Sequence, residues 1–544
     1  MNYEEQQRGG GFGSAPRRLK AFAAAVLAAS TLVSVAACGG SDTATTEDGK
    51  PVLNIAVAKH SLTKKMSEMQ WVKDLEAECD CSIKWQEVSS DWDQKKQAWF
   101  ASGNVPDMIL KGVNMTDIAT YGSLFEDLSD DLDAMPNVKE MFDTDPTSKK
   151  IVTESDGKIH ILPSIKKGWP TTVSHLYINQ QWLDAVGMSM PTTWDELYDV
   201  LVAFKEQDPN GNGEADEVPF DFHSPGTGGF GDYQPHLLLG SLGLTLSNNA
   251  GTGYYVDDNE VKNFFTDDRF KEVIEFLNKC WDAGLINKEA FTHDYATAQS
   301  FARGDGDTAK VGVTWGWTAS DRFGAQLADQ YEPVGPLKAH ADQTEPVVAE
   351  YRKDSMAYNT IALAISAQTK NKEAALKVAN AFYGEDMSVE LLWGDLGVDT
   401  EKVSEGHYKV LDPADSTKDS STWKWTETLA DDSPYWIRPD SEIEYPSDLI
   451  EVQEDEVPMQ SAFDAVDTEN DLMPAFLQLS ADDLKTIQLN NTTILNTAMS
   501  KFSTWVTKGG VENEWDDYVA TLKKANIDQN IELYQKAYDT YMAG

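Results

Sequence analysis

Beyond residue 50, short apolar runs alternate with helical stripes. Residues 52–58 (VLNIAVA) are nearly all apolar, which is typical of a strand covered on both faces. Apolar side chains then recur at every third position from Met66 to Leu75, which indicates one buried helix face. Two further strands and a helix are predicted at 82–88, 107–110 and 93–102. The resulting order β-α-β-α-β predicts an α/β fold built on a parallel sheet.

A second α/β stretch begins near residue 171. Thr193 and Glu196 have the spacing of a capping box, which predicts the start of a helix. Ser480 is placed to cap a long helix that ends near Gly509. Strands are predicted at 310–315 and 359–366, and helices at 372–383 and around 531–541. The α/β pattern therefore continues to a helical C-terminus.

The charge of the chain narrows its possible partners. Acidic residues number 90 against 45 basic ones among 544 residues, which gives a formal net charge of −45. Such a polyanion repels nucleic acid phosphates, anionic lipid and acidic polymers, so we exclude nucleic-acid binding. With 41% apolar and 25% charged residues, the composition is that of a globular protein of several domain-sized units.

The first 38 residues have the layout of a lipoprotein signal. A basic segment at 17–20 precedes an apolar run of small residues, too short to span a bilayer comfortably. The run ends in Val-Ala-Ala-Cys, which resembles a bacterial lipobox. The resemblance implies that residues 1–37 are a cleaved signal peptide, that Cys38 is lipidated and that residues 38–50 form a flexible tether. The alternative is a buried helix that happens to end in cysteine.

The other cysteines and the histidines are sparse. Cys79 and Cys81 are separated by one residue, and Cys280 stands alone. This spacing lacks the two intervening residues of zinc and thioredoxin motifs. We interpret these cysteines either as small buried residues or as forming one optional disulfide. No two histidines lie four positions apart, which argues against a catalytic zinc site.

Residues 208–217 (DPNGNGEADE) predict a calcium loop, because oxygen-bearing side chains recur at alternate positions. The predicted ligands are the side chains of Asp208, Asn210, Asn212, Asp216 and Glu217 and the carbonyl of Glu214. Ca²⁺ takes about six to eight oxygen ligands, and the two glycines permit a tight wrap. Only the first half of an EF-hand loop is matched, since its twelfth position is Pro219. The alternative is a surface turn that needs no ion.

Tryptophans gather in several places and are candidates for stacking on sugar rings. Trp315 and Trp317 lie at the end of a predicted strand, and a second pair lies at 423–425. Trp169 and Trp436 are further candidates. The alternative for each ring is ordinary core packing. No nucleophile elbow, phosphate loop or paired carboxylates nominate a catalytic site.

The sequence resembles the extracellular solute-binding lipoproteins of bacterial ABC transporters, in the large sugar-binding family. The segments that carry the resemblance are 101–109 (ASGNVPDMI), 157–163 (GKIHILP), 176–197, 312–317 (GVTWGW) and 515–538. The calcium-like loop is similar to that of alginate- and fructo-oligosaccharide-binding members. The resemblance implies an α/β fold of two lobes with a hinge between them. The expected lobes are 51–168 with 340–405 (lobe I) and 169–339 with 406–544 (lobe II).

The resemblance implies a receptor and not an enzyme. It would be monomeric, held by its lipid anchor on the extracytoplasmic face of the cell membrane, and would carry Ca²⁺ in the 208–217 loop. It would capture an oligosaccharide between the lobes and deliver it to the permease subunits. A neutral sugar is expected, because a strongly negative protein repels polyuronates such as alginate. Two alternatives stay open: a peptide-binding receptor and a secreted glycoside hydrolase.

Overall fold

The structure is a computed structural model. It describes residues 45–154, 156–166, 170–224, 233–248, 250–304, 306–415, 420–431 and 433–543. The predicted signal peptide, Cys38 and Trp169 lie outside the described residues. Of the predicted tether, residues 45–50 are described and form a turn, in which Thr46 N donates to the Lys50 carbonyl at 2.8 Å. The Lys50 ammonium pairs with Asp80 at 2.8 Å, so this end of the predicted tether is attached to the fold.

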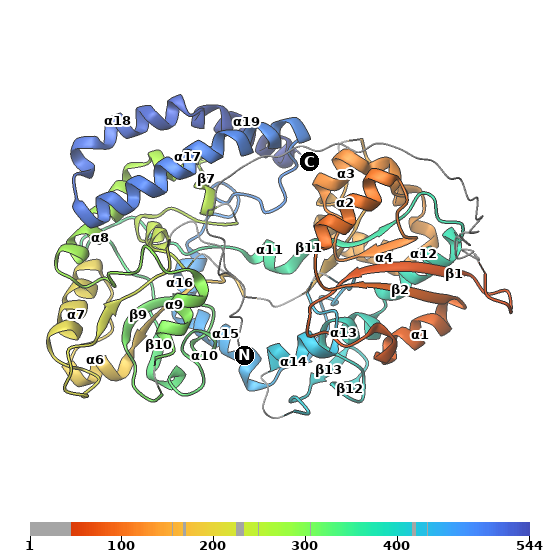
Figure 1. Cartoon of the computed structure of the whole chain (residues 1–544), viewed down its shortest axis with the longest axis horizontal. Helices are drawn as coiled ribbons and strands as arrows, with labels where there is room; N and C mark the ends of the chain where they lie inside the picture. Colours follow the sequence, from red (N-terminus) through yellow and green to blue (C-terminus); the bar gives the residue numbers. More distant parts are fainter. Residues whose placement is uncertain are drawn as a thin grey trace, which may run out of the picture. The chain divides into compact units, whose positions relative to one another are not determined.

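Lobe I is built on a five-stranded sheet in the order β2-β1-β3-β11-β4 (Figure 1). Its strands are β1 (Val52–Ala58), β2 (Ser82–Val88), β3 (Met108–Leu110), β4 (Leu162–Ile165) and β11 (Tyr358–Ile365). β1 is parallel to β2 and β3, as the sequence predicts, whereas β11 is antiparallel to β3 and β4. Asp107, just before β3, accepts hydrogen bonds from the backbone and side chain of Asn54 at 2.8 and 3.1 Å, which ties β3 to β1.

Both faces of this sheet are covered, which explains the continuous apolar run of β1. Ile55 and Val57 face one core and Ala56 faces the other, in strict alternation. Helices α2 (Trp92–Ser102) and α3 (Met115–Tyr121) cover one face (Figure 1). The other face is covered by α1 (Gln70–Cys79), α4 (Pro136–Thr144), α12 (Lys372–Phe382) and α13 (Glu385–Trp393). The short helix α5 (Pro146–Lys150) follows α4.

The core of lobe I extends beyond the boundary that we predicted at residue 405. Tyr408, Leu429 and Ile437 are buried in it, so the stretch from 406 to 437 belongs to lobe I and not to lobe II. A small three-stranded sheet and a helix lie in and beside this stretch. Their bounds are β12 (Thr400–Ser404), β13 (His407–Val410), β14 (Glu442–Glu444) and α14 (Ser420–Glu427).

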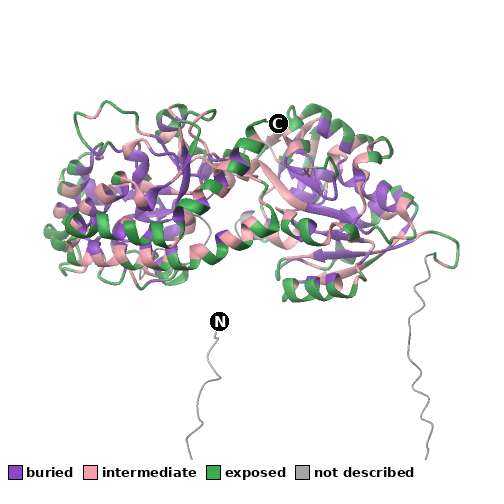
Figure 2. Cartoon of the chain, turned by 90° about the horizontal axis from the view of Figure 1, so that it is seen from above, coloured by how far each residue is buried: buried purple, intermediate pink, exposed green. Residues whose placement is uncertain are grey.

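Lobe II is built on a four-stranded sheet in the order β10-β5-β9-β6. Its strands are β5 (His175–Asn179), β6 (Val218–Phe220), β9 (Val311–Gly316) and β10 (Tyr331–Pro333), and β7 (Tyr254–Asp257) and β8 (Glu260–Asn263) form a separate hairpin. The shorter helices are α6 (Gln180–Val186), α7 (Trp194–Glu206), α9 (Tyr295–Ala302) and α10 (Ala319–Phe323). The sheet strands are largely buried, while the covering helices expose one side to solvent (Figure 2).

Long helices complete lobe II at the C-terminal end of the chain. They are α8 (Asp268–Asp282), α17 (Ala481–Lys508), α18 (Val511–Lys524) and α19 (Ile527–Ala543). Ser480 accepts a hydrogen bond from Asp483 N and Gly509 follows the last residue of α17, as the sequence predicts. Tyr534 and Tyr538 of the predicted stripe pack beneath the β7–β8 hairpin.

Three segments connect the lobes. The first runs from β4 to β5, the second contains α11 (Lys353–Ala357), and the third contains α15 (Ser447–Glu456) and α16 (Gln460–Asp464). Glu456 accepts hydrogen bonds from Thr171 N and, at 2.8 Å, from Thr172 N. Glu350 accepts from Thr172 Oγ1 at 2.6 Å. These carboxylates therefore join all three connections to one another.

The three described cysteines are in two different states. Cys79 and Cys81 form a disulfide across the turn between α1 and β2, with Asp80 in the left-handed region at φ 49°. Cys280 is free and fully buried in the core of lobe II. Burial raises the pKa of the Cys280 thiol to about 12, so this residue acts as a small core side chain.

Candidate functional site

The sheet of lobe II ends in an edge rich in polar side chains. β6 and β9 are parallel, with Phe220 opposite Val313, so both strands end at the same edge. β5 is antiparallel to β9 and begins there, with His175 opposite Gly316. In open α/β sheets, ligands bind outside the carboxyl ends of the strands. This edge is therefore the candidate ligand-binding edge of lobe II.

Trp317 is the first residue after β9 at this edge. Its side chain is half-buried and packs against the core of lobe II. The backbone carbonyl accepts hydrogen bonds from His175 Nδ1 at 2.8 Å and Tyr177 Oη at 3.2 Å. Burial lowers the pKa of His175 to about 4, so the ring is neutral at pH 7 and carries its proton on Nδ1. The backbone of Trp317 is thus fixed, while part of its indole stays accessible.

The other predicted tryptophans are placed differently. Trp315 points into the core of lobe II, is 3% exposed and packs against Phe220 at 5.4 Å between ring centroids. Trp436 is 2% exposed in the core of lobe I, with the Arg438 guanidinium 4.3 Å from its ring centroid. Both rings therefore act in core packing, and neither offers a face on which a sugar can stack. Trp169 lies outside the described residues.

Buried polar side chains follow the same strand ends. Asp221 comes directly after β6, and Arg322 lies in α10 after β9; they are 0% and 1% exposed. Arg322 Nη2 donates to Thr314 Oγ1 at 3.1 Å. Among the described residues, its Nε and Nη1 and the Oδ2 of Asp221 have no hydrogen-bond partner. Buried donors and acceptors without partners are costly, so the cluster is suited to hydroxyl groups or water.

Burial shifts the pKa of both groups toward the neutral form, and the opposite charge of each group opposes the shift of the other. Burial lowers the pKa of the Arg322 guanidinium, and the negative charge of Asp221 opposes that shift. Burial likewise raises the pKa of Asp221, and Arg322 opposes that shift. The edge therefore combines a partly exposed indole with buried polar groups that have unused hydrogen-bonding capacity, a combination suited to polar rings.

The corresponding edge of lobe I also carries aromatic and charged residues. Lys111 follows β3, and its ammonium lies 5.3 Å from the ring centroid of Trp425 in α14. His60, which follows β1, packs on the same indole at 5.2 Å. Trp92 lies so close to Gly112 that a Cβ there would be 2.1 Å from the indole. In the sequence Trp425 stands out only as part of an aromatic pair, and His60, Lys111 and Trp92 carry no signal at all, because the proximity of these residues arises from strand order.

The 208–217 loop, between α7 and β6, is folded by its own side chains. Asp208 Oδ2 accepts from Gly213 N at 3.1 Å, and Asn210 Oδ1 accepts from Asn212 N at 3.0 Å. The amides of Asn210 and Asn212 both donate to Asp216 Oδ1, at 3.2 and 2.9 Å. Gly211 and Gly213 adopt φ values of 70° and 80°, which the wrap requires. The side chains of Asp208, Asn210, Asn212 and Asp216 thus hold the loop together in one turn.

The negative charges of the carboxylates in this loop would be stabilised by a bound cation. Burial raises the pKa of Glu217, and repulsion from Asp208 and Asp216 adds to the shift. Glu217 Oε1 is buried and has no hydrogen-bond partner among the described residues. Within those same residues, no three acidic, histidine or cysteine side chains are grouped closely enough to hold a metal on their own. A calcium set here therefore depends on the asparagine oxygens and on the Glu214 carbonyl.

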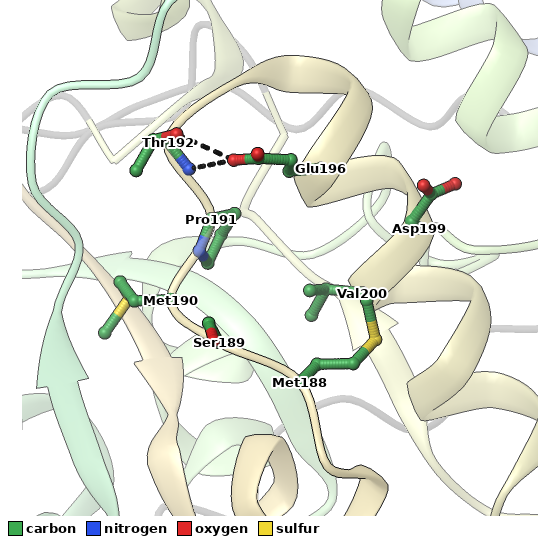
Figure 3. A pocket seen from close by; sticks show the side chains of 8 residues that line it. All are labelled: Met188, Ser189, Met190, Pro191, Thr192, Glu196, Asp199 and Val200. Atoms are coloured by element: carbon green, nitrogen blue, oxygen red, sulfur yellow. Dashed lines mark hydrogen bonds between the residues drawn. The ribbon is translucent and has the colours of Figure 1, made fainter.

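A separate surface pocket of about 270 Å³ lies between α6 and α7 (Figure 3). It is lined by Met188, Ser189, Met190, Pro191, Thr192, Glu196, Asp199 and Val200. At its rim, Glu196 accepts hydrogen bonds from Thr192 N and Thr192 Oγ1 at 2.8 and 2.7 Å (Figure 3). Thr193 Oγ1 accepts from Glu196 N at 3.1 Å. The predicted helix cap is present, but Glu196 reaches Thr192 instead of Thr193. No predicted sugar contact lines this pocket.

Comparison with known proteins now decides the family. The family described as bacterial extracellular solute-binding protein matches residues 60–388. The chain belongs to this family. Among the described helices, none is long and apolar enough to cross a membrane.

Curated relatives and solved structures agree with this membership. The chain is 30% identical to the fructooligosaccharide ABC transporter substrate-binding protein FusA of Streptococcus pneumoniae, over 97% of this chain and 99% of the relative. An HMO binding, ABC-transporter associated solute-binding protein from Bifidobacterium longum infantis is 37% identical, with a TM-score of 0.84, over 91% of this chain and all of that one. The structure of FusA in complex with kestose gives 25% identity and a TM-score of 0.75, over 90% and 99%. The two-lobed α/β solute-binding fold is thereby confirmed.

Proposed function

We propose that this solute-binding protein is the oligosaccharide receptor of an ABC importer, and that it binds a neutral sugar between its two lobes. The observation that carries the proposal is the full-length similarity to FusA, whose name and structure refer to fructo-oligosaccharide. The polar and aromatic carboxyl edges of both sheets support it. The net charge of −45 favours a neutral ligand over an acidic one.

Trp317 is the proposed stacking residue of lobe II. Its backbone is held by His175 and Tyr177, and its indole is half-buried at the same edge of the sheet as Asp221 and Arg322. Trp425 is the corresponding candidate in lobe I, also half-buried. One indole from each lobe would enclose a pyranose or furanose ring. The hydroxyl groups of the sugar would hydrogen-bond to the unpartnered atoms of Asp221 and Arg322.

The experiment is a calorimetric screen of the chain without residues 1–44. The panel contains kestose, longer fructo-oligosaccharides, other neutral oligosaccharides, an oligouronate and a peptide mixture. We expect one neutral oligosaccharide to bind tightly and to be recovered intact. Binding of peptides alone would contradict the proposal in favour of a peptide receptor. Release of shortened sugar would contradict it in favour of a hydrolase.

We further propose a structural Ca²⁺ at Asp208, Asn210, Asn212, Asp216 and Glu217, with the carbonyl of Glu214. The closeness of Asn210 and Asn212 to Asp216 and the buried, unpartnered Glu217 Oε1 support the site. A solved structure of FusA, which is 25% identical to this chain, is described as an EF-hand mutant, and this supports a calcium loop here. Bound Ca²⁺ would relieve the repulsion among the three carboxylates and stiffen the connection between α7 and β6.

Lipid anchoring completes the proposal. The Val-Ala-Ala-Cys segment supports lipidation of Cys38 and residence on the extracytoplasmic face of the membrane. We propose that the protein acts as a monomer and docks on the permease subunits of its importer, since a single receptor contains both lobes of the binding site.

A further inference from the structure

A short chain of hydrogen bonds joins the third interlobe connection to Trp317. Asp455 lies near the end of α15, and its Oδ2 accepts from Tyr177 Oη at 2.6 Å. The same Tyr177 oxygen lies 3.2 Å from the carbonyl of Trp317. A phenol has one hydrogen, so Tyr177 can donate fully to only one of these two acceptors at a time.

We propose that Asp455 is a positioning residue for Trp317, because the proton on Asp455 decides which acceptor receives the Tyr177 hydrogen. When Asp455 is ionised, Tyr177 donates to the carboxylate. When Asp455 is protonated, its own O–H donates to the Tyr177 oxygen, and the Tyr177 hydrogen turns to the Trp317 carbonyl. Nothing is transferred between residues; one proton is gained from solvent and the hydrogen bonds reverse direction.

Because Tyr177 and Asp455 are buried, the loss of a hydrogen bond at either group is costly. Tyr177 is 0% exposed and Asp455 8% exposed, so neither group can replace a lost partner with bulk water. Phe323 packs edge-on against Tyr177 at 5.8 Å, which keeps the phenol between its two acceptors. His175 continues to donate to the Trp317 carbonyl at 2.8 Å in both states, because burial holds it neutral. Of these two hydrogen bonds to the Trp317 carbonyl, the one from Tyr177 is therefore the one that changes with the protonation of Asp455.

The charges facing Asp455 place its titration in the physiological range. Burial raises the pKa of Asp455 to about 7, and repulsion from Glu451, Glu332 and Glu454 adds to the shift. The hydrogen bond from Tyr177 opposes it. Glu451 and Glu454 share α15 with Asp455, and Glu332 lies in β10, against which α15 packs (Figure 1). Tyr177 also faces Tyr233; burial raises the pKa of both phenols, so both are neutral at pH 7.

The consequence for binding rests on the proposed function, in which Trp317 stacks on sugar. Below pH 7, Asp455 is protonated and the Trp317 carbonyl gains a second donor, so the indole is held in place before the ligand arrives. Above pH 7 this bond is lost. One neutral hydrogen bond corresponds to about a two- to tenfold change in affinity. We therefore expect tighter sugar binding at pH 5.5 than at pH 8.5, by that factor.

The test measures affinity by calorimetry at both pH values, with kestose or the tightest sugar of the panel as the probe. Asp455→Asn cannot ionise, and its amide still donates to the Tyr177 oxygen. This variant should keep the tight affinity at both pH values. Tyr177→Phe should show the weak affinity at both. Glu451→Gln removes a charge from the same helix and serves as the matched control, which should keep the pH dependence with a lower midpoint.

A readout without ligand separates this inference from the proposed function. In protein labelled with 5-fluorotryptophan, the resonance lost in Trp317→Phe identifies residue 317. It should shift with a midpoint near pH 7 in the wild type and not in Asp455→Asn. If no sugar binds at any pH, the proposed function fails, and this titration still decides the coupling. A resonance that is independent of pH, or equal pH dependence of affinity in the wild type and Asp455→Asn, overturns the inference.

Discussion

Replacing Asp208 with alanine should remove all calcium-dependent stability of the protein. In the absence of calcium, the variant loses the hydrogen bond from Gly213 N to Asp208 Oδ2, at 3.1 Å. One such bond contributes about 0.5–1.5 kcal/mol. The loss of one negative charge beside Glu217 offsets part of this cost, because Asp208 contributes to the raised pKa of that carboxyl. Without calcium, the variant should therefore be destabilised by about 1 kcal/mol or less.

With calcium, the difference should be larger. A ligand that binds only the folded state stabilises it by about 2.7 kcal/mol at roughly one hundred times Kd. The wild type gains this stability and Asp208→Ala does not, so the gap between them should widen to about 3–4 kcal/mol. The stabilisation should also fade in acid, as protonation of the ligand carboxylates displaces the ion. Glu217 should protonate first, since burial raises its pKa.

The assay is denaturant unfolding of calcium-loaded protein, with and without excess chelator. Glu214→Ala is the matched control in the same loop. The Glu214 side chain is exposed, and its replacement removes one negative charge, as Asp208→Ala does. Only the backbone carbonyl of Glu214 is a proposed ligand, and the substitution keeps it. Glu214→Ala should keep the calcium increment. An unchanged unfolding midpoint for the wild type in chelator would refute the site, and a full increment in Asp208→Ala would refute the ligand set.

Three further outcomes follow from the tryptophans and the cysteines. Trp317→Ala should weaken sugar affinity by about ten- to a hundredfold, or about 1.4–2.7 kcal/mol, with folding intact; Trp315→Ala should instead lower stability by about 3–5 kcal/mol, because its ring is 3% exposed in the core. Calorimetry and thermal melting on both variants distinguish the two roles, and unchanged affinity in Trp317→Ala would remove that residue from the site. Cys38→Ala should move the protein from the membrane fraction to the soluble fraction, and lipid found on the variant by mass spectrometry would disprove the assignment. In the chain without residues 1–44, iodoacetamide should leave Cys280 unlabelled until the protein is denatured, and should label Cys79 and Cys81 only after reduction.

The sequence predicts correctly those strands and helices whose signals lie within a few neighbouring residues. The strands at 52–58 and 82–88 and the long capped helix after Ser480 are confirmed at the predicted positions. An apolar run, a cap and a glycine stop act within a few residues, so they are readable without tertiary structure. The insertion of β11 between β3 and β4 was not readable, because pairing between distant strands leaves no mark on either segment.

The tryptophan pair shows the same limit in the candidate site. Trp315 and Trp317 are two positions apart and would share a face if the strand continued. The strand ends at Gly316, so Trp315 stays in the sheet and points into the core, while Trp317 lies at the start of the following turn. Likewise, Lys111 and Trp425 meet only because α14 returns to lobe I, contrary to the predicted boundary at residue 405.

The interleaving of the two lobes has a consequence for biosynthesis. Leu110 pairs with Leu363, and Trp436 fills the core of lobe I, so that lobe stays incomplete until most of the chain has been made. The core of lobe II in turn includes Phe502 and Leu522. During synthesis, the edge of β3 that pairs with β11 therefore stays unpaired until residue 363 has been made, and such edges invite aggregation. Neither lobe is built from one continuous stretch of chain, so each core closes only when segments from both halves of the sequence are present.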